Sequence, residues 1–98
     1  MTCPEEVRVQ LLTILTIGIR SIRSCCETGQ YGRCKVEATH IHNIPELMQD
    51  FSADKLGYYL EIEAPEYVRD IGGNPVRELR APWESLKHWH AESRRTDG

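Results

Sequence analysis

Hydrophobic residues recur with a helical period along most of the chain. At about 100° per residue, eight apolar side chains between residues 4 and 26 fall on one broad arc of a helix, with polar residues opposite. The width of this arc predicts a central helix from Pro4 to about Cys26 that contacts more than one neighbour. The arc consists of Val7, Leu11, Leu12, Ile14, Leu15, Ile19, Ile22 and Cys26.

Turn signals predict two further helices in the next part of the chain. Glu27-Thr28-Gly29 is typical of a helix end followed by a turn. A second helix is expected over residues 30–42, ended by Asn43 in the left-handed conformation that terminates many helices. Because proline disfavours a helix before it and is welcome in a first turn, Pro45 is expected to open a separate short helix that ends near Asp50.

The C-terminal half predicts two more helices. Ser52 is expected to cap the fourth, with an inner face of Leu56, Tyr59 and Leu60 and with Tyr58 and Ile62 on the far side. Pro65 either kinks this helix or starts a new segment through Ile71. The loop signal Gly72-Gly-Asn-Pro75 follows, and then a last helix over about residues 82–92 with Trp83, Leu86 and Trp89.

These elements predict an all-α fold, an irregular bundle of four to five helices. No convincing strand pattern is present. We expect a single domain over residues 1–91 and a disordered tail over residues 92–98. A chain of 98 residues buries only a thin core, so association with a second copy would add stability.

Charge and cysteine content narrow the classes of function. The net charge is −3, and residues 36–70 carry two basic and eight acidic side chains, which argues against nucleic-acid binding. The four cysteines lack a Cys-x-x-Cys spacing and are expected to be reduced thiols in the cytoplasm. Acidic residues precede the apolar run 11–19, and the run is shorter than the ~20 residues of a membrane span, so no membrane association is expected.

The most chemically suggestive stretch is Glu37-x-x-His40-x-His42-Asn43-x-Pro45. Glu-x-x-His occurs in helical metal sites because residues three apart share one side of a helix. Glu37, His40 and His42 are therefore candidate ligands for a divalent transition metal, although no cofactor is required. His42 projects to the other side of the apolar stripe, so three ligands would need local unwinding, another helix or another subunit. In the alternative interpretation, both histidines simply stabilise the end of the helix.

A second candidate feature is Glu63, which the period of the fourth helix brings to its inner face. A carboxylate there needs a hydrogen-bonding partner, and the sequence favours a buried polar pair between His42 and Glu63. The alternative is that the helix bends near Pro65 and Glu63 reaches water.

The segment from Arg33-Cys34 through Pro45, followed by Leu56-x-Tyr58-Tyr59, resembles a group of small uncharacterised bacterial proteins. The resemblance implies a bacterial, intracellular helical protein. It brings no assigned activity, so no catalytic residue is carried over.

The leading hypothesis is a non-enzymatic interaction or regulatory module that acts as a homodimer and has a further, unidentified protein partner. The predicted dimer interface lies on the first helix, whose apolar arc is wider than a thin core needs, and comprises Leu11, Leu15, Ile19 and Ile22. The alternative is a small metal-binding protein or metal-dependent enzyme built on Glu37, His40 and His42. No catalytic residues are predicted.

Overall fold

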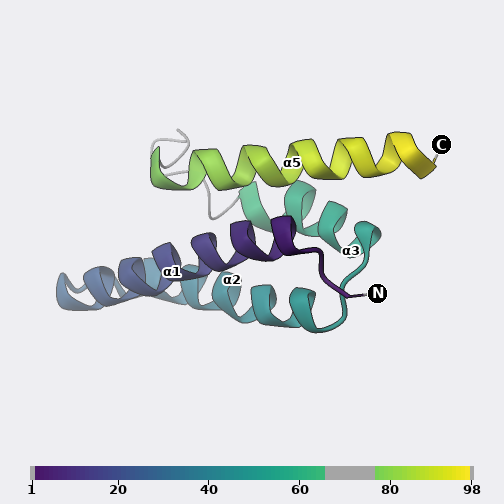
Figure 1. Cartoon of the computed structure of the whole chain (residues 1–98). Coiled ribbons are helices and arrows are strands. Elements are labelled where there is room, and N and C mark those ends of the chain that lie inside the picture. The colour runs from purple at the N-terminus through teal and green to yellow at the C-terminus, as the bar shows by residue number, and fades with distance from the viewer. Residues whose placement is uncertain (1, 66–76, 98) are drawn as a thin grey trace.

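The helices form two layers (Figure 1). The computed structural model describes residues 2–65 and 77–97. The antiparallel hairpin of α1 and α2 makes the lower layer of Figure 1, and α3, the π-helical turn η1 and α5 lie above part of it. The described residues contain no strand, so the predicted all-α class is confirmed. The elements are α1 (Glu5–Glu27), α2 (Tyr31–Gln49), α3 (Ala53–Tyr58), η1 (Tyr59–Glu63) and α5 (Arg77–Asp97).

The first helix forms as predicted. Glu5 and Glu6 lie in its first turn, where the partial positive charge of a helix N-terminus favours carboxylates. Its fully buried positions are spaced four, three and four residues apart, so they form one seam along the helix. At the far end Gly29 adopts a φ of +79°, which a glycine reaches without steric cost, and the chain turns back into α2. The buried seam consists of Val7, Leu11, Ile14 and Gly18.

The second helix is longer than predicted. It continues through Pro45 to Gln49, so the predicted end at residue 42 and the separate helix from Pro45 are wrong. Asn43 is helical rather than left-handed, and among described residues only glycine has a positive φ. Proline within a helix costs about 3 kcal/mol, but Ile44 and Leu47, on either side of Pro45, are both buried in the core. Their burial stabilises the continuous helix.

The third and fourth elements present the predicted inner face. The Ser52 side chain caps α3 by accepting a hydrogen bond from the Lys55 amide at 3.1 Å, as predicted. In η1 the Ala64 amide donates to the Tyr59 carbonyl five residues earlier, which widens the turn. The inner residues are buried and the predicted far-side residues are exposed. The buried set is Leu56, Tyr59 and Leu60, and the exposed set is Tyr58 and Ile62.

The last helix extends beyond both predicted ends. It begins at Arg77 rather than at Pro82 and runs to Asp97, where a disordered tail was expected over residues 92–98. Leu86 is fully buried, and Trp83 and Trp89 pack against the core as predicted. The predicted segment through Ile71 and the loop at residues 72–75 lie outside the described residues.

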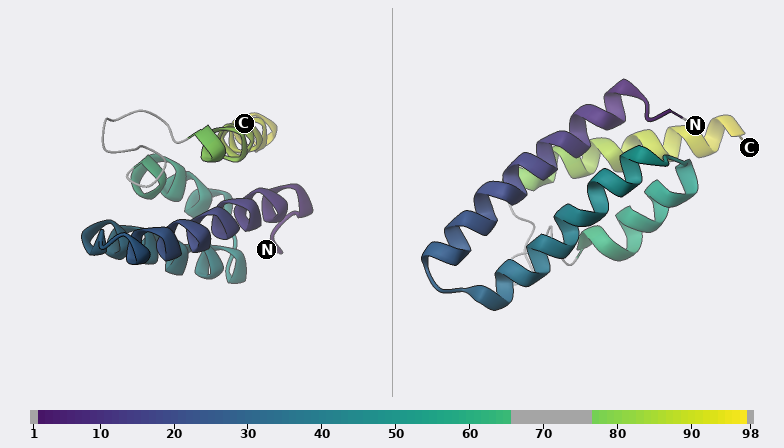
Figure 2. Two further views of the ribbon diagram at one scale, coloured as in Figure 1. Left: turned by 90° about the vertical axis from the view of Figure 1, so that its left-hand side faces the viewer. Right: turned by 90° about the horizontal axis from the view of Figure 1, so that it is seen from below.

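The hairpin of α1 and α2 is only partly covered by the second layer. Its turn end extends beyond the start of α5 in Figure 1 and in both views of Figure 2. The core lies at the other end, where the first half of α1 meets the second half of α2 and the inner faces of α3, η1 and α5. Polar side chains therefore lie between α1 and α2 toward the turn end.

Candidate functional site

The inner face of α2 carries buried polar side chains among its apolar ones. Glu37 and His40 are only 2% and 4% exposed. Because α2 continues past residue 42, positions 37, 40, 44 and 47 share one face of an unbroken helix. Sequence reasoning placed Glu37 and His40 on one flank of the stripe, whereas the structure places both inside the bundle.

Glu37 is held by three side chains of the protein. Its Oε1 accepts hydrogen bonds from Ser21 Oγ at 2.7 Å and from Arg33 Nε at 3.1 Å. Its Oε2 lies 3.8 Å from the Cys25 Sγ, which donates to it. These contacts offset the cost of burying a carboxylate. They connect the end of α1 to α2, and each oxygen of Glu37 takes part in at least one of them.

His40 is hydrogen-bonded to Tyr59 across the interface between α2 and η1. The distance from His40 Nε2 to the Tyr59 hydroxyl oxygen is 2.7 Å, and the ring centroids are 5.2 Å apart. Burial lowers the pKa of His40 from 6.5 to about 4. The imidazole is therefore neutral at pH 7 and is a weak base, which does not suit a general base in catalysis near neutral pH.

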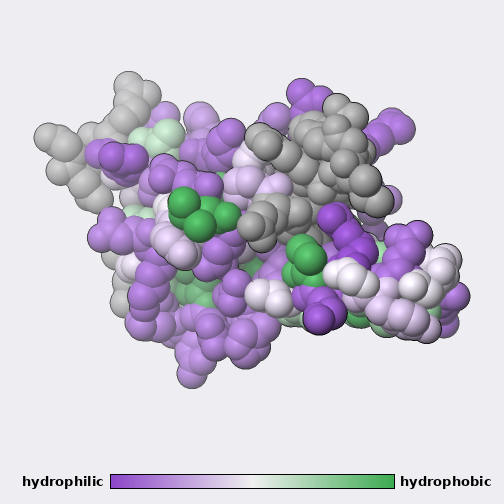
Figure 3. Space-filling view, turned by 180° about the vertical axis from the view of Figure 1, so that it is seen from behind, coloured by the Kyte–Doolittle hydropathy of each residue, from purple (hydrophilic) through white to green (hydrophobic). Residues whose placement is uncertain are grey.

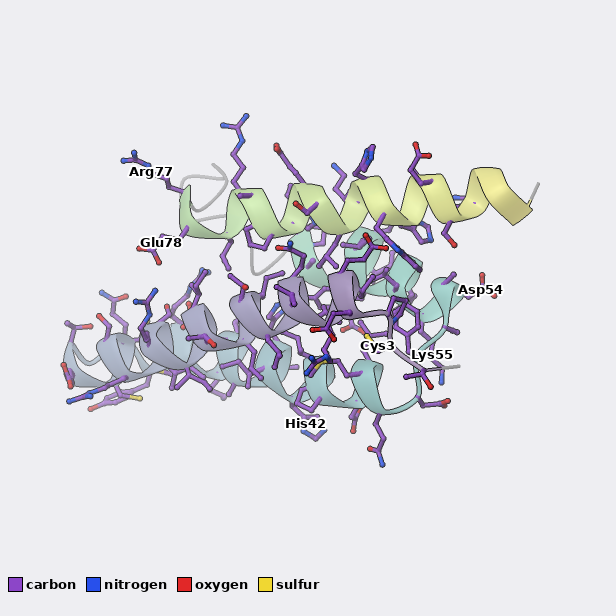
Figure 4. All side chains as sticks on the ribbon, in the orientation of Figure 1. Cys3, His42, Asp54, Lys55, Arg77 and Glu78 are labelled. Atoms are coloured by element: carbon purple, nitrogen blue, oxygen red, sulfur yellow. The ribbon has the colours of Figure 1, made fainter. Side chains whose placement is uncertain are left out.

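A third polar contact joins α2 to η1 and replaces the pair predicted from sequence. Asn43 Nδ2 donates to Glu63 Oε2 at 2.8 Å. His42 instead lies with its Nε2 3.1 Å from Glu46 Oε1, and its side chain is 72% exposed. Figure 4 shows His42 pointing away from the helices. The predicted His42–Glu63 pair is therefore wrong, because an unbroken α2 turns His42 outward and Asn43 toward η1.

The three predicted metal ligands are not brought together. Glu37 and His40 point into the bundle and engage different partners, whereas His42 points into solvent. Across residues 2–65 and 77–97, no group of three or more His, Cys, Asp or Glu side chains is arranged to hold a metal ion. The described residues therefore do not fit a metal site at Glu37, His40 and His42.

A shallow groove of about 370 Å³ lies over this part of α2 and η1. Asn43 and Glu63, which already bond to each other, supply polar groups to it. A larger groove of about 910 Å³ lies away from these residues, between α1 and α5. The polar residues of this site form hydrogen bonds that hold α1, α2 and η1 against one another. The smaller groove is lined by Lys35, Val36, Thr39, His40, Asn43, Ile62 and Glu63.

Sequence reasoning missed the partners that complete this network. The spacing of Arg33 and Glu37 is a familiar signal, since residues four apart on a helix form ion pairs. Tyr59 and Asn43 carried no comparable signal, because their partners lie 19 and 20 residues away along the chain. Contacts at that separation depend on how the helices pack.

The first helix also meets the length and composition expected of a membrane span. An 18-residue stretch of α1 has a mean hydropathy of 1.3. The prediction that this segment is too short to cross a membrane therefore needs correction. A core helix of a soluble protein and an N-terminal signal sequence meet the same criteria, and the property alone does not distinguish these three roles.

The chain matches no known family model, no curated protein and no solved structure. The resemblance to small bacterial proteins therefore stays an expectation from the sequence.

Proposed function

We propose that the protein is a non-enzymatic interaction module of the cytoplasm that acts as a homodimer. Its self-association surface is the outer face, defined as the side of the α1–α2 hairpin that is turned away from α3, η1 and α5. The observation that carries the proposal is that α1 has a second apolar seam, which its own fold covers only in part. The outer face comprises Leu12, Leu15, Ile19 and Ile22 from α1 and Tyr31, Ala38 and Pro45 from α2.

The second seam of α1 has the regular spacing of a packing surface. Its four residues are spaced three, four and three apart, and they lie about 90° around the helix from the buried seam. Leu12 is 38% exposed and Ile19 is 57% exposed, while Leu15 and Ile22 are half-buried and Leu15 also packs against the core of its own chain. Leu11, which the sequence placed in the interface, is fully buried in the core of its own chain. The interface that we propose therefore contains Leu12 in place of Leu11.

The register of the hairpin makes the outer face continuous across both helices. The Ser21–Glu37 hydrogen bond and the Cys26–Cys34 contact fix the register of this antiparallel hairpin. Each residue of α1 lies opposite the residue of α2 that is about equally far from the turn. Pro45 consequently lies beside Leu15, and Ala38 lies beside Ile22. Figure 2 (right) shows α1 and α2 side by side on this side of the molecule.

The size of the outer face suits a dimer. A hairpin of this length covers about 34 Å by 18 Å, at about 1.5 Å per residue and an interaxial distance of roughly 8–10 Å. This is roughly 600 Å² per protomer, at the lower end of stable interfaces. Two such faces brought together around a twofold axis would form a four-helix arrangement.

The charges around the outer face favour a protein partner over a membrane surface. Arg8 lies 2.7 Å from Glu5, and Arg23 lies 3.0 Å from Glu27, so the basic side chains that flank the seam are neutralised within α1. Helices that bind anionic lipids instead carry a net basic flank.

On the back of the molecule (Figure 3), exposed hydrophobic groups are separated by polar ones. A small apolar surface of that kind supports a dimer less well than the outer face does.

Two substitutions of equally exposed isoleucines test the proposal. Ile19 on the outer face is 57% exposed, and Ile62 on η1 is 56% exposed. By light scattering at about 100 µM, the top of the range in which an interface of this size dissociates, the wild type and Ile62→Lys are expected to approach twice the mass of one chain, which is 11.3 kDa. Ile19→Lys is expected to fall to 11.3 kDa. A wild-type monomer, or a dimer that Ile62→Lys disrupts and Ile19→Lys does not, would rule out this interface.

A further inference from the structure

Three of the four cysteines gather at the turn end of the hairpin. Cys25 and Cys26 lie in the last turns of α1, and Cys34 lies in the first turn of α2. The Sγ atoms of Cys26 and Cys34 are 3.1 Å apart, in hydrogen-bonding contact, and both residues are free thiols. We propose that Cys26 and Cys34 form an oxidisable dithiol site that reacts with low-molecular-weight disulfides of the glutathione class. The product is an intramolecular disulfide that joins the end of α1 to the start of α2.

The pairing is selective because each sulfur has a defined neighbour. Adjacent residues on a helix point about 100° apart, so Cys25 and Cys26 face different groups. Cys25 donates toward Glu37 Oε2 at 3.8 Å, whereas Cys26 meets Cys34. Cys3 precedes α1 and Cys26 lies near its far end, so roughly 30 Å of helix separates them at about 1.5 Å per residue. Cys34 is therefore the natural partner of Cys26.

Exposure decides which sulfur reacts first. Cys26 is exposed, whereas Cys34 is only 9% exposed and also donates to the Ile22 carbonyl oxygen at 3.6 Å. A soluble disulfide can therefore reach Cys26 and not Cys34. Burial, followed by the hydrogen bond with Cys26, raises the pKa of Cys34 to about 12, so Cys34 is a thiol at neutral pH. Cys26 is the attacking residue and Cys34 is the resolving residue.

The reaction proceeds by two balanced exchanges. In the first, the Cys26 thiolate attacks one sulfur of the small disulfide, a Cys26 mixed disulfide forms, and one small thiolate leaves. In the second, Cys34 loses its proton and its sulfur attacks the Cys26 sulfur, which releases the second small thiolate. The protein loses two electrons and two protons, and one small disulfide is reduced to two thiols. Burial raises the pKa of the Cys34 thiol, so the second step should become faster as the pH rises from about 7 to about 9.

The site needs no dimer, so its test is separate from that of the proposed function. Reduced, folded protein is incubated with oxidised glutathione, quenched with acid and analysed by mass spectrometry and by non-reducing electrophoresis. The wild type and the control Cys25→Ser are expected to lose one pair of hydrogen atoms and to remain single chains. Cys34→Ser is expected to stop at one glutathione adduct on Cys26. Cys26→Ser is expected to leave Cys34 unmodified while the protein is folded. Should Cys34→Ser fail to fold, as judged by circular dichroism, Cys34→Ala provides the same readout.

Several results would overturn the assignment. These are a glutathione adduct that persists on the wild type at pH 9, a disulfide that Cys25→Ser abolishes, and a disulfide between two chains. Equal reactivity of Cys34 in the folded Cys26→Ser variant would also contradict the order of attack.

Discussion

Acidification should destabilise the protein through one buried residue, His40. The imidazole is 4% exposed and hydrogen-bonded to the Tyr59 hydroxyl at 2.7 Å. Burial disfavours its charged form and lowers its pKa from 6.5 to about 4. Between these two values the unfolded chain binds a proton at this position and the folded chain does not. The free energy of unfolding must therefore fall as the pH falls from about 6.5 to about 4.

The size of the effect follows from the two pKa values. One pKa unit corresponds to about 1.36 kcal/mol, so a pKa near 4 in the folded state implies a total loss of about 3 kcal/mol at or below pH 4. At pH 5 the folded residue is still mostly neutral and the unfolded one mostly charged, which gives a loss of about 2 kcal/mol relative to pH 7.5. For a small domain that is a large share of the total stability.

A substitution separates this contribution from that of other titrating groups. His40→Gln keeps a polar side chain of similar length but does not titrate. The free energy of unfolding of both proteins is measured by urea denaturation at intervals from pH 7.5 to 4.5. The difference between wild type and variant is expected to shrink by about 2 kcal/mol between pH 7.5 and 5, because only the wild type loses the contribution of His40. Parallel pH profiles would show that His40 titrates alike in both states and would refute its burial as a neutral imidazole.

Three other substitutions test the packing of the bundle, each by chemical denaturation. Gly57→Ala places a Cβ 2.8 Å from His90 Nε2 and should cost about 1 kcal/mol, whereas in a His90→Ala background the helix propensity of alanine should make it neutral or stabilising. An unchanged cost in that background would contradict the close approach of α3 and α5. Glu37→Ala should cost about 2–3 kcal/mol, because it removes the buried acceptor that Ser21 and Arg33 share. A loss below about 0.5 kcal/mol would mean that Glu37 is solvated. His42→Ala should change stability by less than about 0.5 kcal/mol, because its ion pair with Glu46 is exposed. A larger loss would indicate that the His42 side chain is buried.

The parts of the fold that the sequence predicts are those governed by local chemistry. The apolar period of α1 and the Ser52 cap depend on residues within a few positions of one another. The inner face of α3 and η1 follows for the same reason. Each of these features is present in the structure.

The errors in the site have a common origin in Pro45. Local propensity places a helix end before a proline, but the burial of Ile44 and Leu47 outweighs that preference and α2 continues. In the continuous helix, His42 points into solvent and Asn43, rather than His42, forms the hydrogen bond with Glu63. The identity of a partner that lies on another helix depends on that tertiary balance, so a single sequence does not reveal it.

Self-association of the reduced wild-type chain is the most direct test of the proposed dimer. Sedimentation equilibrium over about 1–100 µM spans the range in which an interface of modest size dissociates. With increasing concentration, the mass is expected to approach twice the 11.3 kDa of one chain. A mass of 11.3 kDa throughout would contradict the assignment of the outer face to a second copy of the chain.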